Sequence, residues 1–407
     1  MTRLLRTTAM VTALLLIALL LPVGALAKTL EEWMEGYDTG AIWFGEDFHY
    51  DITDEEACWE LLMKPITVLD AGQKEMVAPR TGPGQEYPKV NEDKLGGTIN
   101  GDAAAVHVLG DDEGGWTKIE GVDYYNRIIR GYVRTNLLKE VTPNKEYGII
   151  VDKLTQQLYV FKDGKLWSSC AISTGLPNDE QPYNETAAGE YLMVSRVGDF
   201  DSEGMICAMA LRFNGGDMIH QVPYVFLADG TKRFSTWESK LGQRASHGCV
   251  RTARIANEDG LNMQWLWDNI KINTKVLVWD DYGRRQPYPD DSLELYYNPK
   301  GGSYYHGEAN CRSVKERYLP LTGFLYSELD GEAFAELERC NTCMPVLRKS
   351  TIDELNLARG VEPLEEVHDD VVQPTGEEGA PPSSLDTSLV HEADDDDVII
   401  VLTPPGE

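Results

Sequence analysis

Ser246-His247-Gly248-Cys249-Val250-Arg251 is the stretch that decides the fold of this 407-residue chain. It places a thiol beside the amide groups of a tight turn, with an arginine two residues further on. A cysteine is nucleophilic only as the thiolate, so it needs a base or a positive neighbour. His220 follows the apolar pair Met218-Ile219 and is expected at a strand end, where it can serve as that base. The alternative is a buried structural cysteine near a hydrogen-bonded histidine.

Met218-Ile219-His220, taken with the Ser246–Arg251 stretch, resembles the signature of the L,D-transpeptidase (YkuD-type) catalytic domain. The resemblance extends from about Lys145 to Asp280. It includes Ile149-Ile150-Val151-Asp152, Gln157-Leu158-Tyr159-Val160-Phe161, Gly164-Lys165, Ser173-Thr174-Gly175, a last helix and Thr274-Lys275-Val276. The family implies a β-sandwich with one helix and a cysteine acyltransferase that acts on peptidoglycan.

The resemblance assigns the chemistry to two side chains. Cys249 is the implied nucleophile, attacking the carbonyl after the third residue of a stem tetrapeptide. His220 is the implied base, taking the thiol proton and later delivering it to the departing D-alanine. An acceptor amine then resolves the thioester and gives a cross-link, whereas water would give carboxypeptidase activity.

The remaining motif residues have implied supporting roles. The backbone N–H groups of Gly248 and Cys249 would form the oxyanion hole, with the His247 ring steadying the loop. Arg251 matches a residue that holds the loop or a substrate carboxylate, for which a planar bidentate donor is suited. Ser246 matches a supporting Ser/Thr.

Three departures from the family pattern concern the surroundings of the motif. The 25 residues 221–245 separate His220 from Ser246 by more than usual, and a Tyr224–Arg233 loop placed to cover the site accounts for the excess. Gln221 stands where a small residue usually follows, although any residue supplies the backbone carbonyl that orients the imidazole. The family's Thr-Pro-x-Gly turn appears as Thr186-Ala187-Ala188-Gly189. These differences affect the choice of acceptor amine more than the expectation of catalysis.

The block around the motif reads as short strands with one helix. The expected strands are Tyr147–Val151, Gln157–Phe161, Trp167–Ser173, Glu190–Val194, Ala208–Phe213 and Lys275–Trp279, with a hairpin turn at Lys162–Lys165 and helical spacing over Ala256–Ile270. No glycine-rich phosphate loop lies between a strand and a helix, so no cofactor is expected for catalysis.

Residues 63–142 show short strands separated by turns, which predicts a small β-barrel. Strands are expected at Ala105–Leu109, Trp116–Glu120 and Arg130–Val133. Three segments resemble a bacterial SH3-like domain: the turn Arg80-Thr81-Gly82-Pro83-Gly84, the strand Gly-Gly-Trp-Thr-Lys-Ile and the final strand with Gly-Tyr-Val. Such domains accompany cell-wall enzymes and help bind wall peptides, but a spacer without a ligand remains open because fold does not fix function.

Four residues near the C-terminal end of the folded part form two half-sites for a metal. His306 and Cys311 make one, and Cys340 and Cys343 the other, a set that suits tetrahedral structural zinc. The segment is similar to the zinc-binding module of the bacterial alkylation-repair regulator. A disulfide among these cysteines is the alternative. Cys58, Cys170 and Cys207 are expected to be buried small hydrophobes, and His49, His107, His368 and His391 have no evident partner.

The composition excludes some partners. The chain carries 37 Lys+Arg against 67 Asp+Glu, a net charge of −30, which disfavours binding to nucleic acid or to anionic lipid. The 47 residues from Val361 to Glu407 hold 14 of the acidic residues and no Lys or Arg. Six prolines and few aromatic residues after Gly360 predict a disordered tail.

The first 27 residues resemble an export signal: Arg3 and Arg6, the apolar run Ala9–Leu21, and the small-residue site Ala25-Leu26-Ala27. An uncleaved anchor is the alternative, although the run is short for a bilayer span. The predicted order is signal (1–27), a segment of unknown role (28–62), SH3-like domain (63–142), catalytic domain (145–282), Cys/His α+β module (293–359) and acidic tail (360–407).

The sequence therefore predicts a mainly β, exported peptidoglycan L,D-transpeptidase acting in the cell wall or periplasm. Two alternatives stay open: an L,D-carboxypeptidase with the same site, and a wall-binding protein without catalysis.

Overall fold

The computed structural model describes residues 43–44, 49–72, 75–91, 96–178, 181–340, 342–343, 345–359 and 361. The predicted signal and, apart from Val361, the predicted acidic tail lie outside these residues. In the described part of the chain, no helix is both long and apolar enough to cross a membrane. Strands outnumber helices throughout, which confirms the mainly β prediction.

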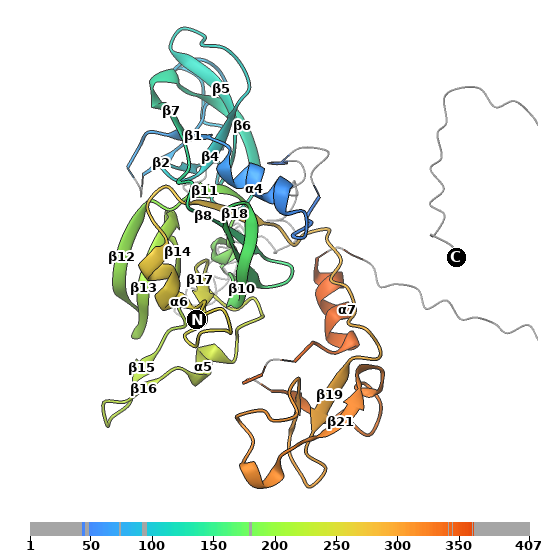
Figure 1. Ribbon diagram of the computed structural model, residues 1–407. Coiled ribbons are helices and arrows are strands. Elements are labelled where there is room, and N and C mark those ends of the chain that lie inside the picture. The colour runs from blue at the N-terminus through green and yellow to red at the C-terminus, as the bar shows by residue number, and fades with distance from the viewer. Residues whose placement is uncertain are drawn as a thin grey trace, which may run out of the picture. The chain divides into compact units, whose positions relative to one another are not determined.

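Five strands between residues 66 and 141 form an antiparallel sheet in the order β6-β5-β4-β1-β7 (Figure 1). They are β1 (Ile66–Leu69), β4 (Ala105–Val108), β5 (Trp116–Val122), β6 (Ile128–Arg134) and β7 (Leu138–Val141), while β2 (Met76–Val77) and β3 (Ile99–Asn100) pair separately. The three strands expected from the sequence are present. The SH3-like identity of this sheet stays a prediction.

Nine strands of the catalytic block form one continuous ladder, β11-β18-β8-β9-β10-β17-β14-β13-β12. Their bounds are β8 (Tyr147–Asp152), β9 (Gln157–Lys162), β10 (Lys165–Ser173), β11 (Gly189–Leu192), β12 (Ser195–Ser202), β13 (Met205–Asn214), β14 (Asp217–Gln221), β17 (Val250–Thr252) and β18 (Lys275–Trp279). All six expected strands are present. β12 and the short strand β17 were not expected.

The two halves of this ladder pack against each other. Ile149 and Val160 of the β8–β9 half lie in the same buried cluster as Leu211 and Ile219 of the β13–β14 half. Alternation along each strand turns these side chains inward, and their burial supplies the main stabilisation of the domain. β10 pairs with β9 along most of its length and with β17 at its end. It therefore joins the two halves and holds β17, the strand that follows Cys249, in the sheet.

The helix expected over residues 256–270 is shorter than predicted. α6 spans only Met263–Asn269, and the preceding residues form turns. Asn257 explains the difference, because its side-chain oxygen accepts hydrogen bonds from the N–H groups of Asp259 and Leu261. Gly260 has a φ of +86°, which a helix excludes. Asn262 then caps the helix by accepting from the N–H of Trp265 at 2.9 Å.

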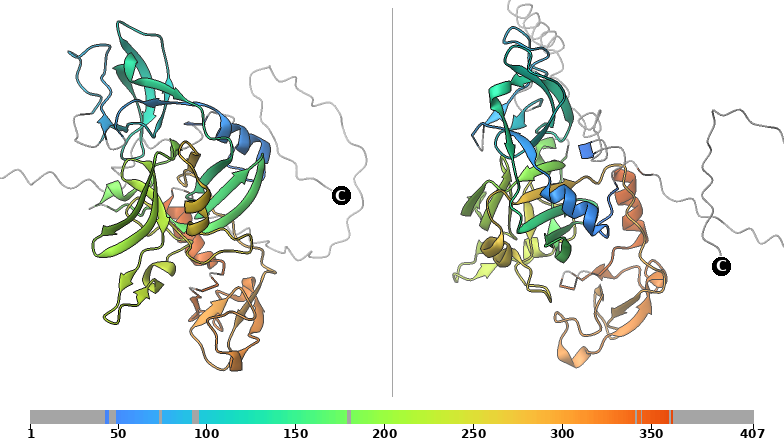
Figure 2. Two further views of the ribbon diagram at one scale, coloured as in Figure 1. Left: turned by 60° about the vertical axis from the view of Figure 1, so that its left-hand side comes forward. Right: turned by 45° about the horizontal axis from the view of Figure 1, so that its top comes forward.

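Part of the 28–62 segment has a structural role. α4 (Glu55–Met63) is capped by Asp54, whose side chain accepts a hydrogen bond from the N–H of Ala57. Cys58 and Leu62 of α4 pack with Ile150 and Trp279 on the outer face of the sandwich. α4 lies along the first half of the sandwich in both views of Figure 2.

The extra residues between His220 and Ser246 form a small hairpin and one helical turn. β15 (Val225–Phe226) pairs with β16 (Lys232–Arg233), and α5 (Ser235–Glu238) follows. The hairpin extends away from the two halves of the sandwich (Figure 1). The expectation that this insertion covers the catalytic cysteine stays untested.

The C-terminal module contains a four-stranded sheet and one helix, in line with the expected α+β segment. Its strands are β19 (Glu294–Tyr297), β20 (Tyr304–His306), β21 (Thr322–Leu325) and β22 (Glu338–Arg339), in the order β21-β19-β20-β22, followed by α7 (Lys349–Ala358). Leu295, Tyr305, Phe324 and Tyr326 form its main apolar cluster.

Candidate active site

Two adjacent parallel strands bring the predicted catalytic residues together. β14 pairs with β17 so that Ile219 lies opposite Val250 and His220 opposite Arg251. Cys249 immediately precedes β17. Since side chains alternate along a strand, Cys249 and Arg251 lie on the same face as His220. Backbone pairing therefore brings together His220 and Cys249, which are 29 positions apart in the chain.

The His220 ring is held in one orientation. Its Nδ1 lies 2.7 Å from the carbonyl oxygen of Gln221, so Nδ1 carries the proton and Nε2 has a free lone pair. The ring of Phe200 contacts it edge-on, with 5.7 Å between centroids. Burial, with a smaller contribution from Arg251, lowers the pKa of His220 to about 4. His220 is therefore a neutral base at physiological pH.

The Cys249 side chain is half-buried, and its sulfur lies 3.8 Å from the carbonyl oxygen of Gly216. Burial raises the pKa of this thiol to about 12, and the Asp217 carboxylate adds to the increase. In the described part of the chain, the thiol has no hydrogen bond to His220. In the structure the pair is therefore a thiol and a neutral imidazole.

Hydrogen bonds fix the loop that carries the nucleophile. The Ser246 hydroxyl donates to the carbonyl of Cys249, and the Arg251 guanidinium donates to the carbonyl of Ala245 at 2.9 Å. Gly248 has a φ of +113°, in the region that favours glycine. These contacts give Ser246 and Arg251 a supporting place in the loop. The His247 side chain is exposed, and in the residues that the structure describes its ring makes no hydrogen bond.

Two loop contacts were not predicted. The Thr186 hydroxyl donates to the carbonyl of Gly248 and accepts from the N–H of Gly175 at 2.9 Å, joining two segments behind the nucleophile. The carboxylate of Asp217 lies so close to Gly248 that a Cβ atom there would collide with it. Burial raises the pKa of Asp217 to about 7. The unusual Thr186-Ala187-Ala188-Gly189 turn was the one sequence signal for the Thr186 contacts, and the Asp217 contact had no signal in the sequence.

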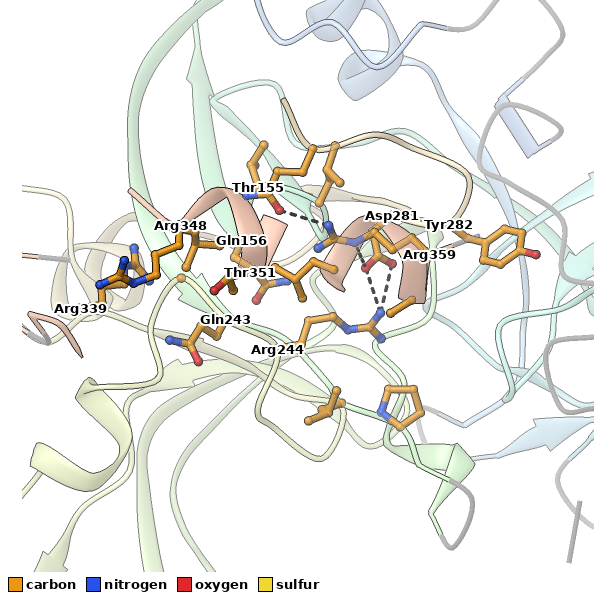
Figure 3. A pocket seen from close by; sticks show the side chains of 18 of the residues that line it. Thr155, Gln156, Gln243, Arg244, Asp281, Tyr282, Arg339, Arg348, Thr351 and Arg359 are labelled. Atoms are coloured by element: carbon orange, nitrogen blue, oxygen red, sulfur yellow. Dashed lines mark hydrogen bonds and ion pairs between the residues drawn. The ribbon is translucent and has the colours of Figure 1, made fainter. Parts of the chain in front are cut away.

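Behind the loop, three basic and three acidic side chains form a buried network. Lys153 lies 2.5 Å from Glu185 and 2.8 Å from Asp280, and the network is completed by Asp281, Arg244 and Arg359. Arg244 and Arg359 both reach the Asp281 carboxylate (Figure 3). Although burial disfavours the charged amine, the carboxylates around Lys153 raise its pKa above the ordinary value. The charges are balanced, as burial requires.

This network forms part of the wall of a cavity of about 660 Å³ (Figure 3). Other lining residues come from α7 and from Leu176 and Pro177 of the catalytic domain. Cys249 and His220 are not among the described lining residues. The cavity is thus separate from the catalytic pair.

The other predicted residues have these positions. The ligand atoms of His306, Cys311, Cys340 and Cys343 all lie within 4.8 Å of one another. All seven cysteines are free in the structure, and Cys58, Cys170 and Cys207 are buried as expected. His107 does have partners: its ring stacks on Trp43 at 4.0 Å and contacts Glu120 and Glu190. No sign of these partners of His107 is visible in the sequence, because all three are distant from it along the chain.

Comparison with known proteins identifies the catalytic block. Residues 146–278 match the model of the L,D-transpeptidase catalytic domain, named YkuD. The Bacillus subtilis (strain 168) protein YciB, provisionally named an L,D-transpeptidase, is 27% identical over 139 residues, 33% of this chain and 66% of that relative. The chain therefore matches just under two thirds of the curated relative. These matches confirm the family resemblance of residues 146–278.

Solved structures of named L,D-transpeptidases are also similar to this chain. The enzyme from Stackebrandtia nassauensis is 21% identical, with 34% of this chain and 57% of that chain covered and a TM-score of 0.24. The catalytic domain of the E. faecium enzyme is 21% identical, with 33% of this chain and 98% of that chain covered and a TM-score of 0.24. The Mycobacterium smegmatis enzyme is 16% identical, with 54% of this chain and 92% of that chain covered and a TM-score of 0.26.

Proposed function

We propose that this chain is an extracytoplasmic peptidoglycan L,D-transpeptidase that works through a Cys249 thioester. The observation that carries the proposal is the β14–β17 pairing, which sets the Cys249 thiol and the His220 imidazole on one face of the sheet. The family match of residues 146–278 supplies the substrate class. The signal-like N-terminus supports action outside the cytoplasmic membrane.

In the first half-reaction, His220 Nε2 takes the thiol proton as the sulfur attacks the carbonyl carbon that precedes D-alanine in a stem tetrapeptide. The N–H groups of Gly248 and Cys249 stabilise the oxyanion of the tetrahedral intermediate. Collapse of the intermediate breaks the peptide bond, and the imidazolium protonates the departing amine. The product is a thioester of Cys249 and free D-alanine.

In the second half-reaction, an amine of a neighbouring stem attacks the thioester carbonyl. His220 accepts a proton from the attacking nitrogen and returns it to the sulfur as the C–S bond breaks. The new amide bond is the cross-link, and the thiol is regenerated. Because His220 is neutral when the cycle begins and ends, it serves as base and acid in both halves.

Two other functions make different predictions for the same chain. Water in place of the acceptor amine gives an L,D-carboxypeptidase, and a wall-binding protein gives no turnover at all. The ordered hydrogen bond from His220 to Gln221 favours catalysis, since a binding surface has no need of a fixed imidazole tautomer.

Product analysis tests the proposal. The purified chain is incubated with disaccharide-tetrapeptide, and the products are separated by mass. We expect dimers that have lost one D-alanine, and no turnover by Cys249→Ala. Cys170→Ala is the matched control, because Cys170 is also a thiol of the sandwich but lies buried on β10. Tripeptide without dimer would support the carboxypeptidase, and unchanged substrate with the wild type would support the wall-binding protein.

A further inference from the structure

We infer that His306, Cys311, Cys340 and Cys343 form a closed tetrahedral zinc site that stabilises the C-terminal module. The four residues come from separate segments: His306 ends β20, Cys311 follows in the next loop, and Cys340 and Cys343 follow β22. Three of them are buried. This site has no part in the transpeptidation chemistry proposed above.

Two distances between ligand atoms match the edges of a tetrahedron around zinc, and all four ligand atoms lie within 4.8 Å of one another. Zinc binds cysteine sulfur at about 2.3 Å and histidine nitrogen at about 2.0–2.1 Å, so the tetrahedral edges are about 3.8 Å between two sulfurs and about 3.6 Å between sulfur and nitrogen. In the structure, Cys311 Sγ lies 3.9 Å from Cys340 Sγ, and Cys343 Sγ lies 3.6 Å from His306 Nδ1. A disulfide would bring two sulfurs to about 2.05 Å. The spacing therefore fits a shared ion better than a bond between Cys311 and Cys340.

Hydrogen-bond donors surround the sulfurs. The N–H of Gly307 points at Cys343 Sγ and the N–H of Thr342 at Cys340 Sγ, each at 3.4 Å. The Ser313 hydroxyl lies 3.1 Å from Cys311 Sγ and 3.5 Å from Cys340 Sγ. Donors in these places stabilise thiolates, the form in which cysteine binds zinc.

The module has a physical need for such a site. The strands that carry the ligands are short, since β20 has three residues and β22 two. The apolar cluster beside the ligands contains one buried residue besides Cys311 and Cys340, namely Leu321. The main apolar cluster of the module, around Leu295, Tyr305 and Phe324, is a separate one, so a structural metal would add folding free energy in the part of the module where apolar burial is smallest. Four protein ligands leave no open position for substrate, so the zinc is structural.

Metal content of the purified full chain tests the inference. After expression with zinc and dialysis against metal-free buffer, we expect about one zinc per chain by elemental mass spectrometry. Cys311→Ser and Cys343→Ser should lose at least about nine tenths of it. Cys58→Ser is the control, because Cys58 is buried in the α4 cluster away from the site and should retain the zinc. Zinc content needs no substrate, so this result is independent of the proposed enzymatic function.

Cobalt substitution identifies the ligands. Co²⁺ in place of zinc should give the visible absorption of a tetrahedral site together with sulfur charge-transfer bands. His306→Cys should keep the metal and intensify those bands, since a fourth thiolate replaces the imidazole. The inference is overturned if the wild type retains no zinc, if it retains iron instead, or if native alkylation and intact mass show a disulfide among Cys311, Cys340 and Cys343.

Discussion

At the scale of single residues, Cys249 and His220 rest as neutral groups. Burial raises the pKa of the Cys249 thiol to about 12 and lowers that of the His220 imidazole to about 4. Both shifts disfavour the charged forms, so a preformed thiolate–imidazolium pair is the less stable state. In the mechanism that we propose, proton transfer therefore accompanies attack on the substrate, with His220 as the general base.

This protonation state predicts the pH dependence of alkylation at Cys249. Only the thiolate reacts with iodoacetamide, so the rate should rise about tenfold per pH unit between pH 6 and 9 without a plateau. Peptide mass spectrometry after timed quenching measures the rate at Cys249 alone. A plateau that begins between pH 5 and 7 would instead demonstrate an ion pair. Transpeptidation should persist down to about pH 4, where His220 gains a proton and ceases to be a base.

Gly248→Ala tests the geometry of the nucleophile loop. A Cβ atom there collides with the Asp217 carboxylate and also strains a φ of +113°. We expect turnover to fall by about 100-fold, because the oxyanion donors are displaced. Gly230→Ala is the matched control, since Gly230 has a φ of +81° but its Cβ would meet no atom within 4 Å. Equal losses in both variants would contradict the role given to the collision.

The sequence could predict that Cys249 and His220 lie close together, because each half of the motif is locally contiguous. The contacts of Asp217 and Thr186 could not be predicted, although both residues contact Gly248, directly before Cys249. Asp217 contacts Gly248 from a neighbouring strand, and Thr186 contacts it from 62 residues away. Such contacts depend on strand pairing, which has no local signature in the sequence.

At the scale of elements, the Thr186-Ala187-Ala188-Gly189 turn joins β11 to the nucleophile loop. The Thr186 hydroxyl satisfies the carbonyl of Gly248 and the N–H of Gly175, both behind the site. Thr186→Val keeps the shape but leaves these groups unpaired, so the free energy of unfolding should fall by about 1–3 kcal/mol per group. Thermal denaturation measures the effect, and Thr186→Ser should restore most of it. A wild-type melting temperature for Thr186→Val would refute this.

Helix length shows where element prediction fails. The apolar spacing over residues 256–270 fits a helix, yet only Met263–Asn269 forms one. Side-chain bonds from Asn257 to the backbone replace helical bonds in the first half. Asparagine and glycine at 257 and 260 were visible in the sequence, so this boundary was predictable from turn chemistry.

At the scale of the whole molecule, buried charges connect the catalytic domain to the end of the C-terminal module. Arg359, just after α7, bonds Asp281 at 3.2 Å, and Asp281 also bonds Arg244, two residues before Ser246. Burial on its own would raise the pKa of Asp281, but Arg244, Lys153 and Arg359 together hold it well below the ordinary value. Stability from this pairing is present above the unfolded-state pKa near 3.8 and is lost as pH falls through the lowered value.

Lys153→Met tests this network. It leaves Glu185 and Asp280 without their central partner, so we expect the free energy of unfolding to fall by about 3–5 kcal/mol. Lys165→Met is the control, because Lys165 makes an ion pair of 2.7 Å with Glu55 but its side chain is 75% exposed. That variant should lose little stability, because solvent screens an exposed ion pair. Urea denaturation compares the two, and similar losses would contradict the importance of burial.

The most direct measurement of the central claim is the intact mass of the protein during turnover. The chain is mixed with disaccharide-tetrapeptide, quenched in acid within seconds and weighed. We expect an added mass equal to the substrate less one D-alanine, located at Cys249, released by hydroxylamine and absent in Cys249→Ala. Cross-linked product formed with no such adduct, or an adduct on any other cysteine, would contradict the claim that Cys249 carries the acyl group.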